Sequence, residues 1–423
     1  MQQEHTRDQF STPAGIPRPP IEARASVVAT SSWKLAVDLA AEELFGQDAP
    51  DGPPDLLILF VNDAWQEHYV ELLHEVRQRS GAGTIVGSSA SGVLAGRHEY
   101  EDVPGLSCLA LWMPGVTVTP VRLHQESLSV LDEPDTWHMT TGVTVDRVKG
   151  IFLLADPYRM DSHDLLCGLR GCYPGVPLVG GMTSASEHRR QTWVFLDSHV
   201  YDEGGVALLF EGPISLVPVV SQGAEPVGEA WTVTKVERNT ILEISNRPAL
   251  DVLLDTADVV SGVRSRESFP FGDWLIGFAV DEYQDSFARG DFIVRGILGA
   301  DRDRRGLVVG GMARVGQTVQ FQMRDPSLAT VDLRQTLLDT RASLKNASPG
   351  AAVLFTCNGR GEDMFGRPHH DTETVAALLP GVPLAGIFCN GEVGPAGPRD
   401  IPMLNGFTAT VALLVPEVGD SEP

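Results

Sequence analysis

The chain has 423 residues and a net charge of -24, because 56 aspartates and glutamates outnumber 32 lysines and arginines. This excess of negative charge argues against nucleic acid as a partner, since phosphate binding needs clustered lysine and arginine. The 43% of hydrophobic and 21% of charged residues are typical of a globular protein with buried cores. No apolar run is long enough to predict a helix that crosses a membrane.

The N-terminal stretch MQQEHTRDQFSTPAGIPRPP carries charges and prolines where a secretory signal would carry an apolar segment. We therefore predict a disordered tail over residues 1–24 and a cytoplasmic protein. An odd number of cysteines in a long chain indicates free thiols in a reducing compartment and not a disulfide framework. The five are Cys108, Cys167, Cys172, Cys357 and Cys389.

Three stretches repeat one plan: an apolar strand, a polar loop, a helix, and a second apolar strand that ends in glycine and small polar residues. The units are LLILFVND to TIVGSSASG (56–92), IFLLADPYRM to PLVGGMTSAS (151–186) and AAVLFTCNGRG to PLAGIFCNGE (351–392). Val61 and Gly87 are as far apart as Leu154 and Gly180, whereas the third unit is longer by the loop GEDMFGRPHH. Each unit predicts two parallel strands joined by a right-handed crossover helix.

Local signals agree with this plan. Asp161 and Asp371 precede the second and third helices as N-caps, and Pro-Gly pairs end those helices. Three apolar stretches with a central turn, at 106–121, 205–220 and 307–323, predict antiparallel hairpins. The fold class is therefore α/β, bordering on α+β, with mixed sheets built from β-α-β units that are each followed by a hairpin.

A more polar region around 224–260, with a short helix PALDVLLDTA, marks a boundary between two halves of the chain. We place one domain at 25–230 and a second at 231–415. The last strand is FTATVALLVP, and a tail follows it at 416–423.

Small polar residues gather at the carboxyl ends of the predicted parallel strands, where α/β sheets bind their ligands. Ala90, Thr183 and Cys389 correspond when the three units are aligned on their glycines, and they are followed by Ser91, Ser184 and Asn390. These side chains predict the polar lining of a pocket, to which we add Ser89. The alternative is that glycine and serine only form tight turns there.

Motifs for two common chemistries fail. In GSSASG, Ser91 stands where a nucleophile elbow around Ser89 needs its last glycine. Gly81 and Gly83 do not have the spacing of a dinucleotide-binding loop, and the chain has no P-loop.

The segment CNGRGEDMFGRPHHD (357–371), with CNGE at 389–392, leaves three interpretations open. Cys357 or Cys389 with His369 or His370 could form a Cys-His nucleophile. The two cysteines with His369 and Asp371 could bind a metal, although the C-x2-C spacing of zinc sites is missing. Otherwise the cysteines are buried as small apolar residues.

Charged and amide side chains in the third unit also predict ligand contacts. Asn358, Arg360, Asn390 and Glu392 offer donors and acceptors, and Arg360 is suited to a carboxylate. Arg295, in the apolar stretch DFIVRGILGAD, is a second candidate for an anion. Either arginine with Glu392 would provide the two charges that a small zwitterion needs.

Several of these stretches resemble the FIST family. VGSSASGVLAGR, PLVGG, VVSQGAEPVG and VTKVERNTILEISNRPALDVL are similar to the FIST N-terminal domain and its junction. GDFIVRGILGAD, VGQTVQFQMRD, FTCNGRGEDMFGRPHHD and PLAGIFCNGEVGP are similar to the FIST C-terminal domain. The likeness covers about residues 25–415.

The resemblance implies an intracellular sensory module that binds small molecules such as amino acids, often beside chemoreceptor, kinase or cyclic-dinucleotide output domains. Some members bind haem and sense nitric oxide, for which His163, His188, His369 or His370 would be candidate ligands here. The family provides no catalytic residues. Where members often have Cys-Arg-Pro, this chain has Ala224-Glu225-Pro226, so the ligand is expected to differ if that arginine holds an anion.

We therefore expect a cytoplasmic, bacterial-type sensory protein that takes part in signal transduction. It would bind a small ligand, such as an amino acid or related small acid, without catalysis, cofactor or metal of its own. The chain leaves no room for an output domain, so a separate output protein is the expected partner. The alternatives are a haem-based nitric oxide sensor and a Cys/His-dependent enzyme.

Overall fold

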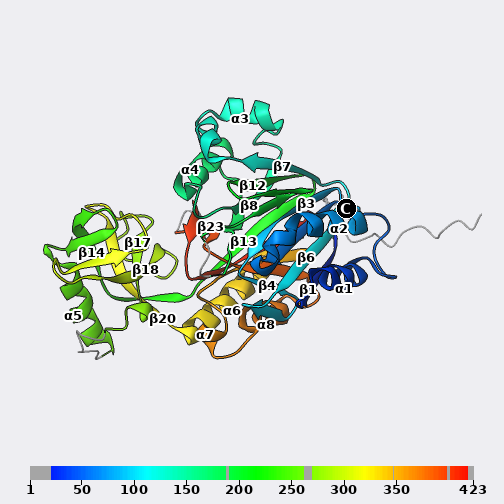
Figure 1. Ribbon diagram of the computed structural model, residues 1–423. Coiled ribbons are helices and arrows are strands. Elements are labelled where there is room, and N and C mark those ends of the chain that lie inside the picture. Colours follow the sequence, from blue (N-terminus) through cyan, green and yellow to red (C-terminus); the bar gives the residue numbers. More distant parts are fainter. Residues whose placement is uncertain (1–20, 187–189, 262–268, 346, 398–400, 418–423) are drawn as a thin grey trace, which may run out of the picture.

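A computed structural model describes residues 21–186, 190–261, 269–345, 347–397 and 401–417 (Figure 1). Each predicted unit forms a parallel strand pair with a helix in between, as expected. The parallel pairs are β2 (Leu56–Asn62) with β3 (Thr84–Ala90), β8 (Val148–Ala155) with β9 (Leu178–Met182), and β21 (Ala351–Cys357) with β22 (Leu384–Cys389). The α/β class with mixed sheets is confirmed.

The three units are equivalent in register as well as in order. Gly87, Gly180 and Gly386 each lie beside a leucine of the partner strand. A Cβ atom at these glycines would lie 1.7, 1.9 and 1.9 Å from the carbonyl oxygen of that leucine. Only glycine allows such a close approach, which explains why glycine recurs at this position of every unit.

Three six-stranded sheets have the same strand order. In each, an edge strand lies beside a strand that runs antiparallel to the parallel pair of one unit, and a hairpin that follows another unit completes the sheet. The first sheet adds β1 (Glu22–Ala29), β6 (Gly105–Trp112), β10 (Val194–Leu196) and β11 (His199–Tyr201) to its parallel pair. The second adds β7 (Thr117–Leu123), β12 (Gly205–Glu211), β23 (Glu392–Ala396) and β24 (Ile401–Asn405). The third adds β13 (Ile214–Gln222), β25 (Thr408–Pro416), β4 (Gly92–Ala95) and β5 (His98–Glu101).

An antiparallel hairpin follows each unit, as predicted, but at other residues. The hairpins are β4–β5, β10–β11 and β23–β24, and each completes the sheet of a different unit. The segments 106–121, 205–220 and 307–323 do not pair with themselves, because their two strands lie in different sheets or are not neighbours in one sheet. Every residue of β6 and β12 is buried. Their sequences therefore lack the alternation of apolar and polar residues that would indicate which strands pair with them.

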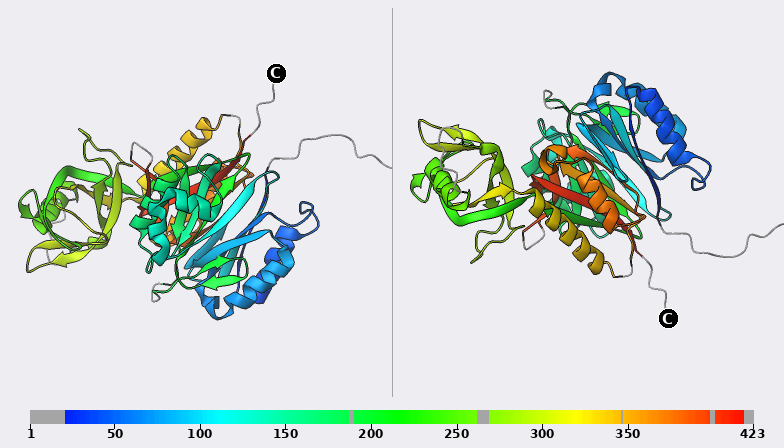
Figure 2. Two further views of the ribbon diagram at one scale, coloured as in Figure 1. Left: turned by 90° about the horizontal axis from the view of Figure 1, so that it is seen from above. Right: turned by 90° about the horizontal axis from the view of Figure 1, so that it is seen from below.

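Residues 224–324 form a separate lobe, which we call the inserted domain and which projects from the three sheets (Figures 1 and 2). Its strands are β14 (Ala224–Glu237), β15 (Thr240–Ile244), β16 (Arg247–Pro248), β17 (Trp274–Ala279), β18 (Phe292–Asp301), β19 (Gly306–Val309) and β20 (Thr318–Arg324). It also contains η3 (Phe271–Asp273) and the predicted helix, α5 (Ala249–Ser261). The sequence-based division at 230/231 falls inside β14, and β1 begins within the predicted tail, most of which lies outside the described residues.

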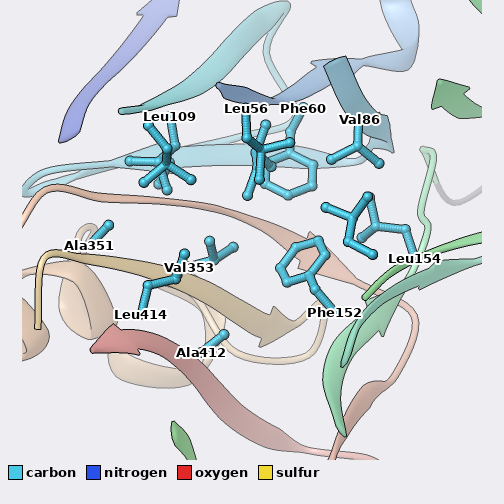
Figure 3. Packing of buried hydrophobic residues seen from close by; sticks show 14 of the residues in the cluster. Leu56, Phe60, Val86, Leu109, Phe152, Leu154, Ala351, Val353, Ala412 and Leu414 are labelled. Carbon is cyan, nitrogen blue, oxygen red and sulfur yellow. The ribbon is translucent and has the colours of Figure 1, made fainter. Parts of the chain in front are cut away.

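The central core lies between the three sheets. Leu56 and Phe60 of the first sheet, Phe152 of the second and Val353 of the third point into it (Figure 3). The rings of Phe60 and Phe152 lie 6.4 and 5.5 Å from the ring of Phe355, measured between centroids. The sheets are thus held to one another by apolar contacts on their inner faces.

Helices cover the outer faces of the sheets. They are α1 (Trp33–Phe45), η1 (Asp63–His68) and α2 (Tyr69–Ser80) on the first sheet; η2 (Gln125–Asp132), α3 (Pro134–Thr141) and α4 (Ser162–Cys172) on the second; and α6 (Pro326–Ser343), α7 (Glu362–Phe365) and α8 (His370–Leu378) near the third. Asp161 caps α4 as predicted, accepting from the amides of residues 163 and 164. Within the described residues, a helix with the length and apolarity needed to cross a membrane is not found.

Candidate functional site

The carboxyl ends of the three units meet at one place. The hydroxyl oxygens of Ser91 and Ser184 lie 3.3 Å apart, and Ser91 Oγ donates to Asn358 Oδ1 at 2.8 Å. Asn358 Nδ2 donates to Asn390 Oδ1 at 2.8 Å, and Asn390 Nδ2 donates to the carbonyl of Thr183 at 3.1 Å. We call Ser91, Ser184, Asn358 and Asn390 the strand-end ring. The alignment of the units placed Ser91, Ser184 and Asn390 at equivalent strand ends, whereas Asn358 was predicted separately as a ligand contact.

Three of the predicted residues, Ser184 of the ring among them, connect the strand ends through buried hydrogen bonds. Ser89 Oγ donates to the carbonyl of Ser184 at 2.8 Å and accepts from the Trp193 amide at 2.9 Å. Ser184 Oγ accepts from the Ser91 amide, and Thr183 Oγ1 donates to Thr192. All three side chains are fully buried, so they tie the units to one another and do not present hydroxyls to solvent.

A pocket of about 1060 Å³ opens beside the strand-end ring, and we call it the strand-end pocket. The first unit and its hairpin contribute Ser91, Gly92, Glu101 and Asp102; the second contributes Tyr158, Ala185 and Ser186; the third contributes Asn358, Gly359, Arg360, Asp363, Met364, Phe388 and Asn390. Asp273 and Arg324 of the inserted domain, with Pro326, complete the lining. All three units and the inserted domain therefore meet at one cavity.

One side of the pocket is acidic. Glu101, Asp102 and Asp363, which we call the acidic wall, come from the end of β5 and from α7. Glu101 accepts from the Glu362 amide at 3.0 Å. Burial raises the pKa of Glu101, and the negative charges of Asp102 and Asp363 raise it further. The carboxylates of the acidic wall thus crowd one another, and no described side chain forms an ion pair with them.

Two arginines, Arg324 and Arg360, line the same pocket. Arg324, at the end of β20, donates to the carbonyl of Gly359 and lies over the Phe407 ring, 5.6 Å from its centroid. Arg360 is held by Asp371 through two hydrogen bonds of 2.8 Å, and the two side chains are only 1% and 3% exposed. The third nitrogen of Arg360, Nη1, is buried and has no hydrogen-bond acceptor among the described residues.

Asp371 does not cap the third helix, so that prediction is wrong. The helix α8 begins at His370, and Asp371 lies inside its first turn, where it accepts from Arg360, Thr356 and His370. Although burial works in the opposite direction, the guanidinium of Arg360 holds the pKa of Asp371 well below its ordinary range. The carboxylate that the local sequence predicted as a helix cap forms an ion pair with Arg360 instead.

Glu392, Cys389 and Arg295 lie outside the described lining of the pocket. Glu392 is fully buried; its carboxylate accepts from the Thr408 amide at 3.1 Å and hydroxyl at 2.6 Å, and from Cys389 Sγ at 3.3 Å. Burial raises the pKa of Glu392 to about 7. Arg295 donates to the carbonyls of residues 294 and 404, and burial lowers its pKa to about 10.

The candidate thiols are not activated. Burial raises the pKa of Cys357 to about 12 and that of Cys389 well above its ordinary value, and the nearby carboxylate of Glu392 raises both further. His369 Nδ1 accepts from the Glu99 amide, and His370 bonds to Asp371 and Thr330. Both histidines thus form their hydrogen bonds with groups other than the two cysteines.

The four residues considered for a metal, Cys357, Cys389, His369 and Asp371, do not come together as a group of ligands. In the described part of the chain, no three or more histidine, cysteine, aspartate or glutamate side chains converge as metal ligands would. Of the histidines considered for haem, His163 is exposed at the start of α4, His369 and His370 are bonded as above, and His188 lies outside the described residues.

We expect Cys167 to react rapidly with Ellman's reagent at pH 8 and the other four thiols to react at least about 100-fold more slowly, because thiolate is the reactive form. Cys167 is exposed, whereas Cys108, Cys172 and Cys389 are buried and the pKa of the partly exposed Cys357 is raised. Stopped-flow absorbance on native protein measures the two phases. The variant Cys167→Ser should lose the fast phase; a fast thiol that remains would restore the nucleophile hypothesis.

Sequence reasoning missed the acidic wall and both contributions of the inserted domain. Glu101 ends a short hairpin that follows the first unit but completes the third sheet, and Asp102 comes directly after it. Asp273 and Arg324 arrive from a lobe with no counterpart in the repeat. Glu225, which stands where the resemblance implies an arginine, pairs with Arg289, and Arg289 also binds Asp332 at 2.9 Å.

Known proteins match this chain over most of its length. The family model of the FIST N domain matches residues 55–247, and that of the FIST C domain matches residues 249–395. An uncharacterized protein of Mycobacterium tuberculosis is 37% identical over 379 residues, which cover 89% of this chain and 94% of that protein. An uncharacterized protein of Mycobacterium bovis is 36% identical over 387 residues, covering 90% of this chain and 95% of that protein.

Two solved structures share a distant likeness. Cyanuric acid hydrolase from A. caulinodans is 8% identical, with a TM-score of 0.35, and the match covers 94% of this chain and 100% of that chain. A chorismatase is 9% identical, with a TM-score of 0.31, and the match covers 93% of this chain and 98% of that chain. Likeness at this level adds nothing about the chemistry of the site.

Proposed function

The chain belongs to the FIST family of ligand-binding sensory domains, and we propose that it is a cytoplasmic sensory protein that holds a small molecule in the strand-end pocket. The observation that carries the proposal is the convergence of all three units and the inserted domain on one cavity. A molecule bound there would contact every major part of the fold at once. Its binding energy would therefore favour one arrangement of those parts over others.

The polar groups of the pocket are suited to orient a small ligand. The amides of Asn358 and Asn390 stand at its edge in a defined hydrogen-bonded arrangement, and Arg324 offers a guanidinium that no carboxylate neutralises among the described residues. An amino acid or related small acid would place its carboxylate at Arg324. Few, well-positioned polar groups in a cavity of this size are typical of binding sites for small molecules.

Binding without catalysis fits the state of the candidate nucleophiles. The Cys357 and Cys389 thiols hold their protons at neutral pH, and the free state of all five cysteines agrees with a reducing compartment. A ligand-induced change would then be transmitted to a separate output protein.

The proposal is tested by a thermal-shift screen of the twenty amino acids, their decarboxylated amines and short mono- and dicarboxylic acids. A ligand at a hundredfold excess over its dissociation constant adds about 2.7 kcal/mol to stability, which raises Tm measurably. The response should disappear in Arg324→Gln and persist in Arg334→Gln, the same change at an exposed position of α6. A flat response across the panel, or equal responses of both variants, would contradict the proposal.

A further inference from the structure

The helix α6 has apolar residues on two opposite sides. On the inner side, Leu333 and Leu337 are at most 1% exposed and pack against the third sheet. On the outer side, Leu328, Val331 and Leu338 are 36%, 60% and 42% exposed. A helix has about 3.6 residues per turn, so the two rows lie about half a turn apart. Burial against the third sheet therefore accounts for only one of the two rows.

The outer residues have the spacing of a surface that pairs with another helix. Leu328, Val331, Gln335, Leu338 and Ala342 follow one another at intervals of three, four, three and four residues, and all five are exposed. This is the a and d pattern of a coiled coil over about two heptads. We call these five residues the α6 seam. Figure 2 shows α6, in gold, at the outer edge of the molecule in both views, where a second helix can lie along it.

Opposite charges flank the α6 seam. Arg334 and Arg341 lie along one side of it, and Asp332 and Asp339 lie along the other, at the g and e positions of the same heptads. Arg334, Arg341 and Asp339 are exposed. Asp332 is partly buried and is bound by Arg289 at 2.9 Å. Arg334 and Asp339 are therefore the pair of opposite charges that is best placed to contact another helix.

The charge pattern decides which helix fits. Between parallel helices the g side of one faces the e side of the other, whereas antiparallel helices bring like sides together. In a parallel pair of two α6 helices, Arg334 of each copy would lie opposite Asp339 of the other. An antiparallel pair would place arginine beside arginine and aspartate beside aspartate, which is unfavourable. A second copy of α6 thus complements the α6 seam in apolar spacing and in charge.

We propose that two copies of this chain pair through their α6 seams, with the helices parallel and related by a two-fold axis. Each copy contributes the same residues, as in other isologous interfaces. Apolar contacts along the seam would stabilise the pair, and the two contacts between Arg334 and Asp339 would set its orientation. A seam of about two heptads buries little surface, so the dimer should dissociate on dilution. The seam lies outside the described lining of the strand-end pocket, so the proposal does not depend on ligand binding.

Sedimentation velocity of the full chain at about 1 to 300 μM tests the pairing. The mass should rise with concentration from the 45.6 kDa of one chain toward twice that value. Val331→Asp with Leu338→Asp should weaken the dimer at least about tenfold, since each substitution places a charge in the apolar contact. Leu39→Asp with Val70→Asp is the matched control, because these residues of α1 and α2 are 44% and 62% exposed. It should leave the dissociation constant unchanged.

An exchange of charges tests the orientation. Arg334→Glu alone and Asp339→Arg alone each place like charges opposite one another in a parallel pair, so each should weaken the dimer at least about threefold at low salt. The double variant, and an equimolar mixture of the two single variants, bring opposite charges together again and should restore dimerisation. Both side chains are exposed, so the variants should fold, which circular dichroism checks.

Three results would contradict the pairing. A chain that stays monomeric over the whole concentration range overturns it and leaves the α6 seam to a helix of another protein. A dimer that Val331→Asp with Leu338→Asp does not weaken has its interface elsewhere. Single charge variants that dimerise poorly, without recovery in the double variant or in the mixture, overturn the parallel arrangement.

Discussion

Asp371→Asn is expected to lower the free energy of unfolding by about 3–5 kcal/mol. The carboxylate is 3% exposed and is the only group in the described residues that forms an ion pair with Arg360. Its removal leaves a buried guanidinium without a counter-charge and places an amide opposite the donors of Thr356 and His370. A buried charge that loses its partner costs far more than the pair contributes when intact. Urea unfolding followed by tryptophan fluorescence measures the change.

The same helix contains a matched control. Glu373 pairs with Arg367 at 2.6 Å, but both side chains are nearly half exposed. Glu373→Gln should therefore cost far less than Asp371→Asn, because exposed ion pairs contribute little to stability. Similar losses for the two variants would show that burial does not distinguish these pairs. The role of Asp371 in holding Arg360 at the pocket would then be in doubt.

The repeated units could be predicted because their signals are local. Strand, cap and glycine recur in one order, and the glycines at 87, 180 and 386 are required by a contact inside each unit. The exchange of hairpins between units could not be predicted in this way. A short strand such as β4 carries no residue that specifies whether its neighbour is β3 or β22, since that choice depends on how three whole sheets pack.

The candidate site also has parts that follow from local signals and parts that depend on how distant elements pack. Ser91, Ser184 and Asn390 of the strand-end ring follow from the alignment of the units, because equivalent positions on parallel strands emerge at the same edge of a sheet. Glu392 was expected to contact a ligand from its place after CNG, yet it bonds to Thr408 of β25 and is buried. Arg324, which sequence reasoning passed over, reaches the pocket only because the inserted domain returns to the core at that residue.

Between pH 4.5 and 7 we expect the protein to lose stability as the pH rises. Glu392 is fully buried, and burial raises its pKa from 4.5 to about 7; Glu99, buried near Asp371, is raised to about 7 as well. A carboxyl group whose pKa is higher in the folded chain holds its proton more tightly when folded. That contribution is complete below the unfolded value near 4.5 and is lost as the pH rises through about 7. The loss amounts to about 3 kcal/mol at most for each group.

Glu392→Gln separates this effect from the rest of the titration, because the amide cannot ionise but can still accept from Thr408. The variant should match the wild-type chain near pH 4.5 and exceed its free energy of unfolding at pH 8, by up to about 3 kcal/mol. Glu67→Gln, at an exposed position, should leave the wild-type profile unchanged. Asp371 changes the free energy of unfolding in the opposite sense and at lower pH. Its pKa is depressed in the folded chain, so its contribution to stability is lost on acidification. A variant that follows the wild-type curve from pH 4.5 to 8 would mean that Glu392 is already ionised in the folded chain, stabilised by Arg295 and Arg360 despite its burial.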